Sequence, residues 1–259
     1  MNYGCNGRRA VISGGTSGIG LAAARTLLAD GAEVWLLART ERPQLLEELK
    51  ESYGEKVHFI QCDVANVASC KTAAAQIKNA GNIDFLVNSA GIYREQSMEM
   101  LTETEFDEIF GVNVKGTVFL TQTLLPYMAA AGAVVNVASD AGVSGNYGCA
   151  AYCASKGAVV AFTRALALDT APRLRVNCVC PADIDTPLLQ RQLEAAGGSY
   201  TLADVAEAYP MGRVGRAEEV AHVICSLLSP ANSFMTGSIV TVDLSLIHIS
   251  EPTRLQLIS

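Results

Sequence analysis

The sequence predicts one doubly wound α/β domain over residues 1–243, with a seven-stranded parallel sheet and helices on both faces. Short runs rich in β-branched residues alternate with longer helical stretches, and right-handed crossovers arrange such a pattern as a parallel sheet. The strand runs are almost continuously apolar, as strands covered on both faces should be. Hydrophobic residues make up 50% of the 259 residues and charged residues 17%, which is ordinary for a chain with a large buried core.

The individual elements follow from the hydrophobic periodicity. The predicted strands cover residues 9–12, 33–38, 57–61, 83–88, 133–137, 175–179 and 238–242. Apolar stripes at helical spacing predict helices over residues 19–30, 42–52, 67–79, 103–130 with a break near Gly111, 150–169 and 217–228. The connection over residues 181–210 is long for this architecture. Long ordered connections are usually functional, so we expect a substrate lid, with a plain surface insertion as the alternative.

The charge and cysteine patterns exclude several classes of protein. A formal charge of −7 and the lack of any basic block argue against nucleic-acid binding. No apolar run reaches the roughly 18 residues of a membrane helix, and the apolar stretch after Arg8 and Arg9 is too short for an export signal. The eight cysteines form no Cys-x-x-Cys pair and the three histidines are scattered, so we expect free thiols, no metal site and a cytoplasmic location.

A glycine-rich turn over residues 13–20 (SGGTSGIG) follows the first predicted strand and opens the first predicted helix. Glycines let backbone N–H groups approach a pyrophosphate, and the helix N-terminus favours its charge. The spacing Gly-x-x-x-Gly-x-Gly differs from the Gly-x-Gly-x-x-Gly of many dehydrogenases, and a glycine turn can also be a plain loop. The strand before it and the helix after it favour a dinucleotide site.

Residues after the second and third strands indicate which dinucleotide is bound. Arg39 follows the second strand, at the place where an arginine accommodates the 2′-phosphate of NADP and a carboxylate would bind the ribose of NAD. Arg39 therefore favours NADP(H), while Glu41 keeps NAD(H) open. Asp63 follows the third strand, where it can accept a hydrogen bond from an adenine amine, cap the next helix, or do both.

Tyr152 and Lys156 lie four residues apart on a predicted helix and so share one face. A lysine charge about 4 Å from the phenol would lower the phenol pKa by up to roughly three units, into the range for acid–base work on a carbonyl or alcohol. Such a pair also arises by chance. Ser139 ends the fifth strand, where ligands bind in such sheets. Asn113 is an amide among apolar neighbours and needs partners. A helix-bending asparagine that bonds to the backbone is the plain alternative to a functional role, and the two are compatible.

Together these residues resemble the short-chain dehydrogenase/reductase family from about residue 8 to residue 243. The matching motifs are Gly14-x-x-x-Gly18-x-Gly20, Asp63, Asn88-Ser89-Ala90-Gly91, Asn113, Ser139, Tyr152-x-x-x-Lys156, Asn177-x-Val179-x-Pro181, Thr186-Pro187, the segment 212–221, and Thr236-Gly237 with Val242-Asp243. The resemblance implies a Rossmann-type fold, a nicotinamide dinucleotide cofactor, a small-molecule alcohol or ketone substrate, and a homotetramer or homodimer.

The resemblance also implies a role for each site residue. Tyr152 would be the general acid/base, and Lys156 would lower its pKa and hold the nicotinamide ribose. Ser139 would position the reacting oxygen, and Asn113 would hold a water in the proton relay. The implied cofactor-binding residues are Gly14, Thr16, Ser17, Gly18, Ile19, Gly20, Arg39, Asp63, Val64, Asn88, Ala90, Gly91, Tyr152, Lys156, Pro181, Ile184 and Thr186.

The chain departs from the family pattern at a few positions. Ser13 replaces the usual threonine, and its hydroxyl can do the same work. Ser17 stands where many NADP users have a basic residue, so Arg39 alone indicates NADP. Ala182 replaces a usual glycine, and its Cβ would disfavour a positive φ and crowd the approach to the nicotinamide.

The sequence therefore predicts an NADP(H)-dependent oxidoreductase that interconverts a secondary alcohol and a ketone, with a hydroxysteroid dehydrogenase-like activity as one candidate. A 3-oxoacyl-[acyl-carrier-protein] reductase, with a basic patch from Arg94 and Arg191, and a sugar-alcohol dehydrogenase are alternatives. A dinucleotide-binding sensor without turnover is the non-enzyme alternative. The predicted pocket residues are Tyr93, Asp140, Asn146, Tyr147, Cys149, Ile184, Leu188 and Leu189.

Residues 244–259 look foreign to this pattern. The string from Leu244 to Arg254 resembles the translation of a sequencing adapter, with a genuine extension as the alternative. We therefore expect these residues to carry no function.

Overall fold

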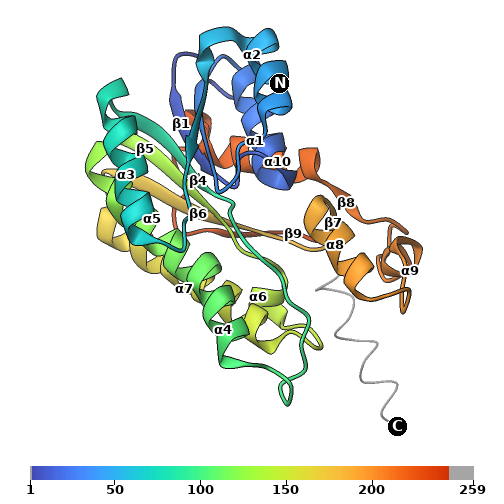
Figure 1. Ribbon diagram of the computed structural model, residues 1–259. Coiled ribbons are helices and arrows are strands. Elements are labelled where there is room, and N and C mark those ends of the chain that lie inside the picture. The colour runs from blue at the N-terminus through green and yellow to red at the C-terminus, as the bar shows by residue number, and fades with distance from the viewer. Residues whose placement is uncertain (1, 245–259) are drawn as a thin grey trace.

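The computed structural model describes residues 2–244 and contains a seven-stranded sheet in the order β3-β2-β1-β4-β5-β6-β9 (Figure 1). All neighbouring strands of this sheet run parallel. The strands are β1 (Arg9–Ser13), β2 (Glu33–Ala38), β3 (Val57–Gln61), β4 (Ile83–Asn88), β5 (Met128–Val137), β6 (Leu174–Pro181) and β9 (Ile239–Val242). The strand order reverses between β1 and β4, and such switch points create the ligand crevice in open α/β sheets.

Helices cover both faces of the sheet, which confirms the predicted doubly wound architecture (Figure 1). One face packs against α1 (Gly18–Ala29), α2 (Pro43–Tyr53) and α10 (Ala217–Leu228). The other packs against α3 (Val67–Ile77), α5 (Thr117–Leu124) and α7 (Ala150–Thr170). Ile12 and Leu36 point into the first core and Val11 and Leu37 into the second, so both faces of one strand pair are buried. Continuous apolar runs are therefore what these strands require.

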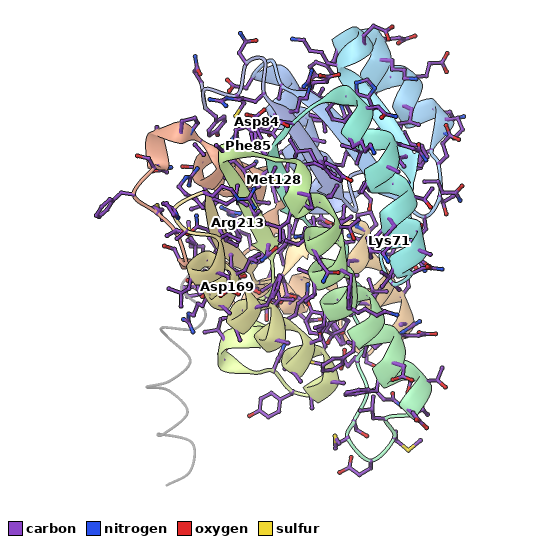
Figure 2. The ribbon with its side chains drawn as sticks, turned by 90° about the vertical axis from the view of Figure 1, so that its left-hand side faces the viewer. Lys71, Asp84, Phe85, Met128, Asp169 and Arg213 are labelled. Atoms are coloured by element: carbon purple, nitrogen blue, oxygen red, sulfur yellow. The ribbon has the colours of Figure 1, made fainter. Side chains whose placement is uncertain are left out.

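The predicted helix over 103–130 is wrong at its end, because residues 128–130 belong to β5. Met128 pairs with Ile83, and after an irregularity Ala133 pairs with Phe85. Figure 2 shows Asp84, Phe85 and Met128 close together where β4 and β5 lie side by side. The alanines of this segment suit a helix by propensity, but pairing with β4 overrides that local preference.

The predicted break near Gly111 is a π-helical turn. It covers Gly111–Gly116 and separates α4 (Glu103–Phe110) from α5. Such turns inside α-helices often mark functional sites. Asn113 lies inside this turn and is 1% exposed, so the irregular backbone sets the position of a buried amide.

The long connection after β6 is not one loop. It forms β7 (Ile184–Asp185), α8 (Pro187–Ala195) and α9 (Leu202–Glu207), and β7 pairs with β8 (Gly215–Arg216). Figure 1 shows these elements beyond the carboxyl edge of the main sheet. This segment is therefore ordered and positioned to cover a ligand, and its role as a lid stays a prediction.

Within residues 2–244, no helix has the length and apolar character to cross a membrane. No group of three or more potential metal-binding side chains occurs in that range. All eight cysteines are free thiols. The prediction that residues 244–259 are foreign to the domain lies, beyond Leu244, outside the residues that the structure describes.

Candidate active site

A cavity of about 710 Å³ lies at the carboxyl end of the sheet, beside the switch point between β1 and β4. Its volume is in the range of small-molecule and cofactor sites. Its walls come from the glycine turn, the loop after β4, the segment from β5 to α7, and the segment from Pro181 into α8. The predicted site residues that line it are Gly14, Ser17, Gly18, Ile19, Ala90, Gly91, Ser139, Tyr152, Lys156, Pro181, Ile184 and Thr186.

The glycine turn has the geometry of an anion site. Gly14 and Gly18 have φ values of 67° and 50°, which side chains other than glycine rarely adopt. The side chain of Ser17, the N-cap residue of α1, makes no capping hydrogen bond. The first-turn N–H groups of this 12-residue helix therefore lack a side-chain acceptor beside the cavity, which fits a pyrophosphate.

Two close approaches hold this turn in place. A Cβ on Gly20 would overlap the carbonyl oxygen of Gly14, so only glycine fits there. The Ser13 hydroxyl accepts hydrogen bonds from the N–H groups of Ser89 and Ala90, both at 3.2 Å. Serine thus ties the turn to the loop after β4.

Tyr152 is 8% exposed and lies edge-on to Tyr93, with ring centroids 4.8 Å apart. Its pKa is raised above the usual 10, mainly by burial, while a hydrogen bond with Ser139 lowers it and the nearby Asp140 carboxyl adds to the increase. The expected lowering of this pKa is therefore wrong for the protein in this state. Burial disfavours the phenolate, and the phenol is held as a proton donor.

Lys156 is directed toward the sheet rather than toward the phenol oxygen. Its Nζ donates to the carbonyl of Val137 at 3.0 Å and lies 5.8 Å from the centroid of the Tyr152 ring. Burial lowers its pKa from 10.5 to about 8. Its backbone is packed tightly as well, because a Cβ on Gly142 would lie 2.6 Å from the carbonyl carbon of Lys156.

Ser139 and Asp140 form a hydrogen-bonded pair at the end of β5. Ser139 Oγ donates to Asp140 Oδ1 at 2.8 Å, and the Ala141 N–H donates to the same carboxylate oxygen at 2.7 Å. Burial and the carboxyls of Asp183 and Asp243 raise the pKa of Asp140 to about 6, although its hydrogen bonds oppose this. A carboxylate therefore lies directly beside the hydroxyl that we expect to hold the reacting oxygen.

The side chain of Asn113 has its partners within the protein. Its Oδ1 accepts from the Ile92 N–H at 2.9 Å, and its Nδ2 donates to the Ile92 carbonyl and to Ser155 Oγ, both at 3.0 Å. The structure therefore shows the backbone-bonded arrangement, and the expected role of Asn113 in a proton relay stays a prediction. Because these bonds join the loop after β4 to α7 beside Lys156, the amide holds two cavity walls together.

The remaining cofactor residues lie outside the cavity walls, which do not include Thr16, Gly20, Arg39, Asp63, Val64 or Asn88. Arg39 is exposed after β2, and the carbonyl of Leu37, two residues before it, accepts from the N–H of Gly14 at 2.8 Å. Asp63 Oδ1 accepts from the N–H of Ala65, while Asn66 caps α3. The alternative of Asp63 as the helix cap is therefore wrong.

Asn88 is buried under the sheet edge. Its Nδ2 donates to Thr121 Oγ1 and to Asn136 Oδ1. Its Oδ1 is the one buried side-chain polar atom among the described residues without a hydrogen-bond partner. The amide therefore ties the end of β4 to α5 and β5 and does not line the cavity.

Of the predicted pocket residues, only Cys149 does not line the cavity; it is buried against Tyr152. Arg191 lines the cavity, whereas Arg94 pairs with Glu108, so the predicted basic patch does not form. Ala182 has no positive φ, so its Cβ causes no backbone strain, while the expected crowding of the nicotinamide stays a prediction. The pocket residues Asp183 and Gln192 were not predicted, because their spacing matches no motif.

Comparisons with known proteins cover nearly the whole chain. The family described as enoyl-(acyl carrier protein) reductase matches residues 14–244. The 3-oxoacyl-[acyl-carrier-protein] reductase FabG of Aquifex aeolicus is 33% identical over 249 residues, covering 94% of this chain and 98% of that protein. The cyclopentanol dehydrogenase of Comamonas sp. is 36% identical over 244 residues, covering 92% and 96%. The solved structure of ElxO with NADP bound has a TM-score of 0.87 at 29% identity, covering 93% and 99%.

These similarities agree with the strand order, the glycine turn and the grouping of Ser139, Tyr152 and Lys156 around one cavity. The site residues also fit a nicotinamide dinucleotide, because the uncapped helix N-terminus and the side chains of Ser139 and Tyr152 face the same space. The chain belongs to the short-chain dehydrogenase/reductase family of oxidoreductases, enzymes that act on CH–OH groups with a nicotinamide dinucleotide.

Proposed function

We propose that this enzyme interconverts a secondary alcohol and a ketone with NADP(H), using Tyr152 as the general acid/base. The observation that carries the proposal is the meeting of the Tyr152 phenol, the Ser139 hydroxyl and the Lys156 ammonium in one cavity with the glycine turn. The cofactor supplies or accepts the hydride when bound.

Each side chain has a defined task in this proposal. Ser139 holds the substrate oxygen, and Tyr152 gives its proton to that oxygen as a ketone is reduced. The raised pKa keeps Tyr152 protonated for this task. Lys156 places a positive charge below the tyrosine ring, where its contact with Val137 fixes its direction. Asn113 keeps the loop after β4 and α7 at a fixed separation.

The catalytic assignment is tested by Tyr152→Phe, assayed by NADPH and NADH oxidation with cyclopentanone and cyclohexanone. We expect kcat to fall by roughly 10²–10⁴-fold, the usual contribution of a general acid, while cofactor binding is retained. Tyr127→Phe, at the opposite end of the sheet beside the start of β5, is the matched control and should keep wild-type kcat. A wild-type protein that binds cofactor but turns over no ketone or alcohol would instead support the sensor alternative.

The preference for NADP(H) rests on Arg39, which is exposed near the glycine turn. The NADP bound to the similar protein ElxO supports this assignment. In a fluorescence titration we expect NADPH to bind at least tenfold more tightly than NADH, about 1.4 kcal/mol. Arg39→Ser should weaken NADPH binding and leave NADH binding unchanged. Tighter NADH binding by the wild type would overturn the assignment and favour NAD(H).

A second candidate is a 3-oxoacyl-[acyl-carrier-protein] reductase, favoured by the similarity to FabG and by Arg191 in the cavity wall. The carboxyls of Asp140 and Asp183 line the same cavity and favour neutral substrates over anionic ones. Comparing acetoacetyl thioesters with the neutral ketones distinguishes the two activities.

The predicted homotetramer or homodimer also remains a proposal. Phe106 on α4 and Leu168 on α7 are 40% and 80% exposed, and neighbouring helices that expose apolar side chains support an interface there. Sedimentation velocity of the wild type and of Leu168→Lys tests this proposal, since the variant should form smaller species. A wild-type protein that sediments as a monomer would contradict the proposal.

A further inference from the structure

Asp140 is held beside the reacting groups by the sheet itself. It follows Ser139 at the end of β5, and its N–H donates to the carbonyl of Pro181 at 3.0 Å, at the end of β6. The side chain lines the cavity. Its position is therefore set by two neighbouring strands rather than by a loop alone.

The two carboxylate oxygens of Asp140 have different surroundings. Oδ1 accepts from Ser139 Oγ and from the Ala141 N–H. Across residues 2–244, no side chain or backbone group donates to Oδ2. An ionised carboxylate offers about four acceptor positions, so Oδ2 keeps capacity to bind a donor in the cavity.

The other carboxyl in the cavity differs in this respect. Asp183 Oδ2 accepts from the Tyr209 hydroxyl at 2.8 Å, and the same hydroxyl accepts from the Asp183 N–H at 2.9 Å. Asp183 is thus engaged with the segment after α9. The cavity wall formed by α8 is apolar at Leu188 and Leu189. The cavity therefore has one side that accepts hydrogen bonds, at Asp140, and another that accommodates hydrocarbon.

We propose that Asp140 Oδ2 binds a hydroxyl on the carbon next to the reacting carbon, so that the preferred substrates are neutral vicinal diols and the corresponding α-hydroxy ketones. The inference rests on the proposed function, because it takes the reacting oxygen to lie at Ser139 and Tyr152. Ser139 Oγ is bonded to Asp140, so a substrate oxygen on that hydroxyl brings its neighbouring carbon beside the same carboxylate. A carboxylate or phosphate at this position would be repelled.

The experiment compares reduction of 2-hydroxycyclohexanone with that of 2-methoxycyclohexanone by the full chain, with NADPH and with NADH. The hydroxyl of the first ketone can donate a hydrogen bond to Asp140, whereas the methyl ether of the second can only accept one. We expect kcat/KM to favour the hydroxy ketone at least tenfold in the wild type. In Asp140→Ala the ratio should fall toward one, even though the lost contact with Ser139 slows both reactions.

Two further variants make the result specific to Asp140. Asp183→Asn removes the other cavity carboxylate, which is bonded to Tyr209, and should leave the ratio as in the wild type. Asp140→Ser keeps a small polar side chain at the start of α6 (Ala141–Ser144) in case the alanine variant does not fold, and should also lower the ratio.

The outcomes separate this inference from the proposed function. A wild-type ratio near one, or a ratio that persists in both Asp140 variants, overturns the subsite while leaving ketone reduction in place. A protein that binds cofactor but reduces neither these two ketones nor cyclohexanone contradicts the proposed function, and the subsite with it.

Discussion

Replacing Lys156 with methionine should stabilise the fold near neutral pH while removing activity. Lys156 is 6% exposed, and burial lowers its pKa from 10.5 to about 8. The unfolded chain therefore binds this proton more tightly than the folded protein does. Below about pH 8 the lysine is charged in the folded and in the unfolded protein. There the lowering of its pKa from 10.5 to about 8 corresponds to roughly 3 kcal/mol against folding. This penalty fades as the pH rises from 8 to 10.5.

The methionine variant loses one favourable contact, the 3.0 Å hydrogen bond to the carbonyl of Val137, which is worth about 1 kcal/mol. We therefore expect Lys156→Met to exceed the wild type by about 2 kcal/mol in free energy of unfolding at pH 6.5. The difference should disappear by about pH 10, where the folded lysine is neutral and the remaining burial penalty no longer exceeds the contribution of the lost hydrogen bond.

Urea denaturation of both proteins without cofactor, at several pH values between 6.5 and 10, measures this difference. Lys71→Met is the matched control, because Figure 2 shows Lys71 on the outer side of α3 and it is exposed. That variant should differ little from the wild type and show no trend with pH. Lower stability of Lys156→Met at pH 6.5, or a difference that does not change with pH, would refute the reasoning.

Three further changes test the packing around the site. Gly20→Ala should lower the melting temperature by several degrees and weaken cofactor binding at least tenfold, because the new Cβ would overlap the Gly14 carbonyl. Gly111→Ala is the control, because its Cβ would meet only Ala65 at 3.8 Å, and it should leave both quantities nearly unchanged. Asn136→Ala breaks buried hydrogen bonds to Asn88 and Thr163 and should lower the free energy of unfolding by about 3 kcal/mol in urea denaturation. Thr72→Ala, on the exposed side of α3, should cost under about 1 kcal/mol. Tyr200→Phe removes the hydroxyl that hydrogen-bonds Gln192 of α8, which lines the cavity, and Glu95 in the loop after β4, at 3.0 Å each. If the segment after β6 is a lid, KM should rise about threefold with stability unchanged, whereas an unchanged KM would favour a plain surface insertion.

The sequence predicted the sheet well because its strands are buried on both faces. Runs such as Ala10-Val11-Ile12 and the segment Glu33–Ala38 have no side that faces water, so their length and apolar character identify them as buried strands. The glycine turn was equally predictable, because positive φ values at Gly14 and Gly18 require glycine. These features depend on local sequence alone.

What could not be predicted depends on groups brought together by the fold. Residues 128–130 became strand through pairing with Ile83, which the local sequence does not reveal. The direction of the Tyr152 pKa shift was wrong because a four-residue spacing shows that two side chains share a helix face, but not that burial outweighs the lysine charge. Asp183 was missed because its partner Tyr209 lies 26 residues away.

Burial explains the ionisation of the whole site. It opposes charge on Tyr152, Lys156 and Asp140 alike, raising the pKa of the two acids and lowering that of the base. With a pKa of about 8, Lys156 is still mostly charged at pH 7, whereas Tyr152 is fully protonated. The protein without cofactor thus presents a proton donor to the cavity, the state that ketone reduction needs. Lys156 lines the same cavity, and its hydrogen bond to the Val137 carbonyl holds the cation against the tyrosine ring despite the cost of burial.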